Sequence, residues 1–82
     1  MNGMDIEAMD VREKVAGVWK KALKAEEVNP AVDFFDAGGR SLAAINMLAE
    51  LQREFRVEID LEAFFMSPTL DATVRHIESA LG

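Results

Sequence analysis

Two amphipathic helical patterns flank the stretch Asp33–Leu42, which reads DFFDAGGRSL and decides how the chain folds. Its two glycines let the backbone turn, and Ser41 follows them at the start of a helix. The long connection from Glu26 to Arg40 needs side chains of its own to order it. We therefore expect the ring of Phe34, Phe35 or both to be buried between the helices. Ser41 should then be exposed at the N-terminus of the second helix.

Length and composition describe one small domain. The chain has 82 residues, half of them hydrophobic, which suffices for a single core and argues against disorder. It contains no cysteine, which excludes disulfides, thiolate chemistry and metal sites with cysteine ligands. The net charge of −6 opposes binding to a phosphate backbone, so we expect no nucleic-acid partner. We also expect a cytoplasmic protein without membrane association, because no long apolar run or secretory signal is present.

Four helical patterns, with no strand pattern of comparable strength, predict an all-α fold: a four-helix bundle of three main helices and a short third one. The expected helices cover about Ile6 to Lys24, Ser41 to Phe55, Leu61 to Met66, and the residues after Thr69, which is their expected cap. Residues 1–5 are expected to form a flexible tail, and residues 6–82 the domain. The initial Met1 leans towards a discrete protein, with a domain cut from a larger synthetase as the alternative.

Apolar residues spaced by three and four predict which helix faces are buried. The predicted core positions of the first helix are Ala8, Val11, Val15, Val18 and Ala22, widened by Trp19 and Leu23. Those of the last helix are Leu70, Val74, Ile77 and Leu81.

The second helix carries two apolar stripes. One, which we assign to the core, spans about 100° of arc and comprises Ala44, Met47, Leu48, Leu51 and Phe55. The other lies about 130° away and comprises Leu42, Ile45 and Ala49. A single wide buried face is the alternative interpretation. We prefer a docking surface beside Ser41, because one helix of a small bundle has no second core to offer.

Ser41 has a structural and a functional interpretation. On Gly38–Ser41 alone, a helix cap is the stronger one, because glycine turns the chain and a serine hydroxyl accepts from a free amide. A longer pattern reverses this preference. Its landmarks are the Asp33–Asp36 lead-in, Gly38, Gly39, Ser41, Leu42, Leu51, Phe55, Val57, Ile59, Phe65, Pro68 and Thr69. With these in register, the chain from about Val11 to Leu81 resembles the phosphopantetheine-dependent carrier proteins, most closely a peptidyl carrier protein (thiolation domain) of nonribosomal peptide synthesis.

The resemblance implies a carrier without catalytic activity. Phosphopantetheine would be attached to Ser41, within a motif that includes Gly38, Gly39, Arg40 and Leu42. A phosphopantetheinyl transferase with bound magnesium would attach it, and the arm would hold an amino acid or peptide as a thioester. The other implied partners are an adenylation enzyme or domain and condensation, tailoring or thioesterase enzymes, in secondary metabolism such as antibiotic biosynthesis. We expect a monomer.

The implied partner-binding residues lie on the second and third helices. Leu42 and Ile45 are the expected first contacts, and the remaining members of this surface are Ala49, Phe64 and Met66. Phe65 is assigned mainly to the core.

Two residues depart from the usual pattern of these carriers. Ala37 stands where leucine is more common, and Arg40 where histidine or aspartate usually precedes the serine. Around the second helix, the arginines at 40, 53 and 56 outnumber the glutamates at 50 and 54. Fatty acyl carriers usually surround the serine with acidic charge, so this balance favours a peptidyl or aminoacyl carrier. A polyketide-type acyl carrier is the alternative within the class, and an unmodified helical protein-docking module the alternative outside it.

Other classes of function fit the residues less well. A hydrolase would need a base for Ser41, and the only histidine, His76, lies about 120° from the core stripe of its helix. Asp33 and Asp36 lack the ligand spacing of a calcium loop, and loop hydrogen bonds explain them better. The glycine pair lacks the strand and the lysine of a nucleotide-binding P-loop.

Overall fold

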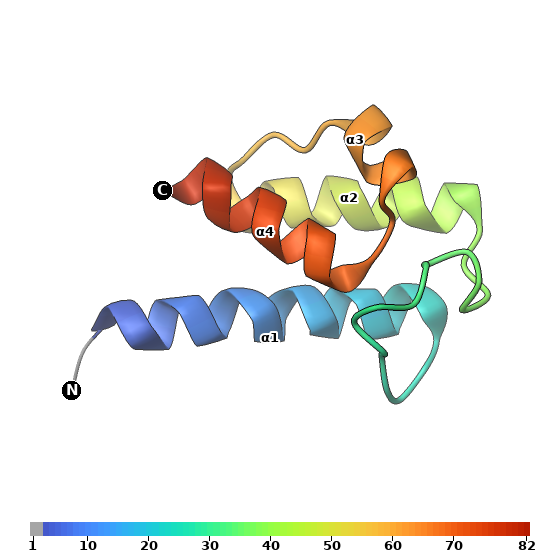
Figure 1. Ribbon diagram of the computed structural model, residues 1–82, viewed down its shortest axis with the longest axis horizontal. Helices are drawn as coiled ribbons and strands as arrows, with labels where there is room; N and C mark the ends of the chain where they lie inside the picture. Colours follow the sequence, from blue (N-terminus) through green and yellow to red (C-terminus); the bar gives the residue numbers. More distant parts are fainter. Residues whose placement is uncertain (1–2) are drawn as a thin grey trace.

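The computed structural model describes the backbone of residues 3–82 and the side chains of residues 11–82. In this part of the chain there are four helices and no strand. The helices are α1 (Gly3–Leu23), α2 (Ser41–Phe55), α3 (Leu61–Met66) and α4 (Leu70–Leu81). Both α2 and α4 pack on α1, and the long connection between α1 and α2 closes one end of the molecule (Figure 1). The predicted all-α, four-helix architecture is confirmed.

The helix boundaries follow from local capping. The Oδ1 atom of Asp60 accepts from the amide of Glu62 (3.1 Å) at the start of α3, and Thr69 Oγ1 accepts from the amide of Ala72 (3.2 Å) at the start of α4. The predicted Thr69 cap is thereby confirmed. After α2, the side chain of Gln52 accepts from the amide of Ile59 (2.7 Å) and secures the turn towards α3.

α1 begins at Gly3, three residues before the start that the sequence predicts. The helix therefore takes in part of the predicted tail, of which Met1 and Asn2 lie outside the described residues. The side chain of Ala8, a predicted core position, also lies outside the described part of the chain.

The core draws on the predicted stripes of all three main helices, with Val18, Ala22 and Leu23 of α1 only partly buried against it. Its buried members on these helices are Val11, Val15, Trp19, Ala44, Met47, Leu48, Leu51, Leu70, Val74 and Ile77. Phe55 is half-buried against this core. The core assignment of Leu81 is wrong: its side chain is 51% exposed, because it ends α4 one turn beyond the last buried position, Ile77.

Five aromatic rings join the α1–α2 connection to the helices. The ring of Phe34 is fully buried and meets Trp19 edge-on, with centroids 5.4 Å apart. Phe64 of α3 approaches both rings, at 6.0 Å from Trp19 and 6.2 Å from Phe34. Such edge-to-face pairs add to the free energy gained by burial. Phe34 is therefore the residue of the connection that packs into the helix bundle, as the sequence predicts. The half-buried Phe35 lies beside it, with ring centroids 5.5 Å apart.

The roles predicted for Phe64 and Phe65 are reversed in the structure. Phe64, predicted to contact partners, is 2% exposed, whereas Phe65, predicted to be in the core, is 43% exposed. The sequence could not decide between them, because α3 has only six residues and periodicity over so short a helix leaves its rotation open. Its rotation directs Phe64 towards Trp19, and Phe65 stacks on Phe35 at 5.7 Å.

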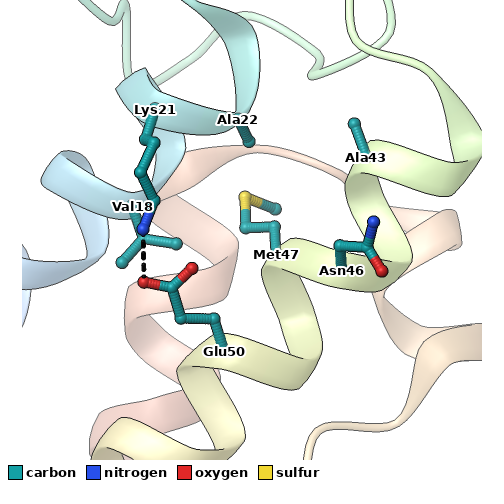
Figure 2. A pocket seen from close by; sticks show the side chains of 7 residues that line it. All are labelled: Val18, Lys21, Ala22, Ala43, Asn46, Met47 and Glu50. Atoms are coloured by element: carbon teal, nitrogen blue, oxygen red, sulfur yellow. Dashed lines mark hydrogen bonds and ion pairs between the residues drawn. The ribbon is translucent and has the colours of Figure 1, made fainter.

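Ion pairs on the surface tie α1 to its two neighbours. Arg12 pairs with Asp71 of α4 (2.8 Å), and Lys21 pairs with Glu50 of α2 (2.8 Å; Figure 2). Exposed pairs of this kind contribute only about 0–1 kcal/mol. Burial of the core side chains therefore contributes more to the stability of the bundle than these ion pairs do. No helix within the described residues has the length and apolar character needed to span a membrane.

The two adjacent phenylalanines of α3 provide a matched test of this packing. We expect Phe64→Ala to lower the free energy of unfolding by about 3–5 kcal/mol, because it removes a buried ring. Phe65→Ala should cost about 1 kcal/mol, since it removes one stacked and partly exposed ring. Urea denaturation of the two variants and the wild type measures both values. Equal losses, or the opposite order, would contradict the assignment.

Candidate functional site

Ser41 is exposed and is the first residue of α2. Arg40, in an extended conformation (φ −115°, ψ 161°), occupies the capping position and makes no side-chain cap hydrogen bond. Among the described residues, the hydroxyl of Ser41 has no hydrogen-bond partner. Ser41 therefore does not cap this helix, which removes the structural interpretation that its local sequence favours. The side chain of Ser41 is thus exposed, with no hydrogen bond to a described residue.

The connection before Ser41 is ordered by Phe34 and Asp33. The backbone of Phe34 donates to the carbonyl of Pro68 (2.8 Å) and accepts from the amide of Gly39 (2.9 Å). Asp33 Oδ1 accepts from the amides of Phe35 (2.7 Å) and Asp36 (3.3 Å). These bonds form a turn of the kind that aspartate side chains favour. Asp33 is thus a loop residue, and the described side chains include no cluster of three or more His, Asp or Glu that could hold a metal ion.

The two glycines before Ser41 meet different requirements. Gly38 has φ of +103°, a conformation that side chains disfavour. Gly39 lies against the ring of Phe34, and a Cβ atom at this position would overlap that ring. The glycine pair therefore lets the chain turn tightly over the buried phenylalanine and enter α2 at Ser41.

The start of α2 suits an anion. The first amides of a helix have no partners within the helix, and its first turn here contains no acidic residue. Arg40 adds a positive charge next to Ser41. An exposed, unpartnered hydroxyl beside these groups fits a phosphate ester on Ser41.

Exposed apolar side chains occur on α2, which begins at Ser41, and on α3. Leu42 is 69% exposed and Ile45 44%, while Ala49 is half-buried. On α3, Met66 is 84% exposed, and Phe65 takes the surface role that the sequence assigned to Phe64. We name Leu42, Ile45, Phe65 and Met66 the docking patch. His76, also exposed, lines a hollow on α4 to which no residue of this patch contributes.

A groove with a volume of about 510 Å³ lies between the end of α1 and the start of α2. We name it the Ser41 groove, because both neighbours of Ser41 line it. Its lining residues from α1 are Ala22 and Leu23, from the connection Lys24, Gly38, Gly39 and Arg40, and from α2 Leu42, Ala43 and Asn46. Sequence reasoning missed this groove, since only the fold brings the two helix ends together.

Comparisons with known proteins agree on one family. Residues 13–77 match the family described as "Phosphopantetheine attachment site". Surfactin synthase subunit 1 of Bacillus subtilis (strain 168) is 44% identical over 68 residues, which are 83% of this chain and 2% of that protein.

Solved structures give the same result at the level of the whole domain. The chain is similar to PCP, a prototype for the peptidyl carrier domains of modular peptide synthetases: 32% identity, TM-score 0.74, covering 83% of this chain and 90% of that one. A chain in the complex of the phosphopantetheine transferase Sfp with coenzyme A and a peptidyl carrier protein is 30% identical. Its TM-score is 0.79, and the match covers 84% of this chain and 90% of that one.

Proposed function

Because the chain belongs to the phosphopantetheine attachment-site family, as a carrier domain of the peptidyl type, we propose that Ser41 is the residue that bears its prosthetic group. The observation that carries this proposal is the exposed hydroxyl of Ser41, which has no partner among the described residues, at the start of α2. Residues 6–82 would then form the carrier domain.

The residues around Ser41 prepare it for modification by another enzyme. Gly38 is exposed and has no side chain, so a foreign active site can approach the backbone before the serine. No described side chain is hydrogen-bonded to the Ser41 hydroxyl to act as its base. In the proposed reaction, a phosphopantetheinyl transferase supplies the base and the magnesium ion. The serine oxygen bonds to the phosphorus that bears pantetheine, and the pyrophosphate bond of coenzyme A breaks. Adenosine bisphosphate leaves, and the hydroxyl proton passes to the transferase.

The prosthetic group, once bound, supplies the thiol on which an amino acid or peptide is held as a thioester. The chain itself contributes the anchor and the docking patch. We infer that Leu42 and Ile45 contact the transferase, an adenylation enzyme or domain, and condensation, tailoring or thioesterase enzymes, with Phe65 and Met66 at the edge. Their exposure supports this role, because large apolar side chains left exposed on a small protein are available for interaction with partners.

The setting proposed for the carrier is the assembly of a nonribosomal peptide such as an antibiotic, in the cytoplasm. Support comes from the similarity to surfactin synthase subunit 1 and to tyrocidine synthase 2 of Brevibacillus parabrevis. This chain corresponds to 2% of the length of each, so only the carrier portion of those proteins is compared.

Intact mass spectrometry tests the attachment site. After incubation with coenzyme A, magnesium and a broad-specificity transferase, we expect the wild type to gain the mass of one phosphopantetheine. Ser41→Ala should gain none, whereas Ser79→Ala, which removes another exposed serine, should be modified like the wild type. A folded wild type that stays unmodified beside a modified control carrier would instead favour an unmodified docking module.

Substitutions in the docking patch test the partner surface. We expect Leu42→Asp and Ile45→Asp to lower kcat/KM for the transferase about tenfold, because each removes an apolar contact at the centre of the interface. The free energy of unfolding should change by about 0.5 kcal/mol or less, since both side chains are exposed. Leu81→Asp is the matched control: it makes the same change at an exposed leucine of α4 and should leave the rate unchanged. Unchanged rates for both patch variants, or loss of their helicity, would contradict the assignment.

A further inference from the structure

The Ser41 groove is cationic in an acidic protein. Lys24 and Arg40 line it and no carboxylate does, although the whole chain carries a net charge of −6. Within the described residues, neither cationic side chain has a hydrogen-bond or ion-pair partner. Unpaired lysine and arginine side chains facing one groove favour an anionic occupant, and phosphate oxygens are among their strongest partners.

The groove continues along the two helices away from Ser41. It shares Ala22, Ala43 and Asn46 with a hollow of about 210 Å³ between α1 and α2. Figure 2 shows this hollow, with Ala22 of α1 across from α2, Asn46 beside Ala43, and the ion pair of Lys21 and Glu50 on its other side. The amide of Asn46 has no hydrogen-bond partner among the described residues, so it can both donate to and accept from a bound chain.

We propose that the phosphopantetheine arm, once attached to Ser41, lies in the Ser41 groove between α1 and α2. Its phosphate is held between Lys24 and Arg40, and an amide of its chain bonds to Asn46. This inference rests on the proposed function, since it takes Ser41 as the point of attachment. The groups of the arm (phosphate, methylated carbon, amides, thiol) find complementary groups among the lining residues: two cations, apolar side chains and an amide side chain.

The size and position of the groove suit this occupant. Its volume of about 510 Å³ falls within the range of about 300–1,000 Å³ that small-molecule sites have. Both neighbours of Ser41 line it, so the first atoms of the arm are tethered beside it. Ala43 and Ile45 are separated by about 200° around the helix. An arm lying against Ala43 therefore leaves the Ile45 side of the docking patch open to a partner.

Isotope-filtered NMR on the modified protein tests the proposal. Unlabelled coenzyme A and a transferase place an unlabelled arm on uniformly labelled protein, and intact mass confirms complete modification. We expect NOEs from the arm's methyl groups to the methyl groups of Ala22 and Ala43. Contacts confined to the methyl groups of Ile45 and Met66, or no contacts to the protein, would overturn the proposal. Failure to gain mass would instead count against the proposed function itself.

Charge reversal tests the phosphate contact separately. Lys24→Glu should lower the population of the docked arm about twofold or more, the effect expected for an exposed ion pair. The amide shifts of Ala43 and Asn46 between unmodified and modified protein report this population. Lys20→Glu is the matched control, because it makes the same charge change in α1 at a residue that does not line the groove. Equal shifts in the two variants would contradict a phosphate held by Lys24.

Discussion

The burial of the Phe34 ring is the constraint on which the rest of the structure depends. It fills the space between Trp19 and Phe64 and so joins a residue of the long connection to α1 and α3. Its backbone bonds to Pro68 on one side and Gly39 on the other. The connection is thus fixed up to two residues before the start of α2. The position of Ser41 therefore follows from a hydrophobic contact.

Most of the fold could be predicted from the sequence, because apolar spacing and capping are local signals. The bounds of α2 and α3, the cap at Thr69 and the exposure of Leu42 all follow from them. The exchange of Phe64 and Phe65 could not be foreseen, since a helix of six residues does not reveal its own rotation. Leu81 matched the core spacing of α4 but lies beyond the part of that helix that the described core covers.

Some features of the candidate site could likewise be predicted from the sequence, and others could not. The resemblance located Ser41 and its flanking motif, and the structure adds that Arg40 rather than the serine holds the capping position. The Ser41 groove had no signal in the sequence, because Lys24 follows α1 and Asn46 lies in α2, and only the folded connection brings these segments together. No carboxylate lines this groove, although the whole chain has a net charge of −6. The local excess of arginine therefore leaves the groove beside Ser41 positively charged, which favours a phosphate group there.

Hydrogen exchange of the amides of Phe34 and Gly39 is the most direct test of the central claim that the loop before Ser41 belongs to the cooperative core. Both amides are hydrogen-bonded, to Pro68 and to Phe34 respectively. Their opening free energies should lie within about 1 kcal/mol of global unfolding, as for the amide of Leu51 in α2. They should also fall with denaturant at the same slope. Rapid exchange that is independent of denaturant would mean that the loop opens on its own, and that Phe34 does not hold Ser41 in place.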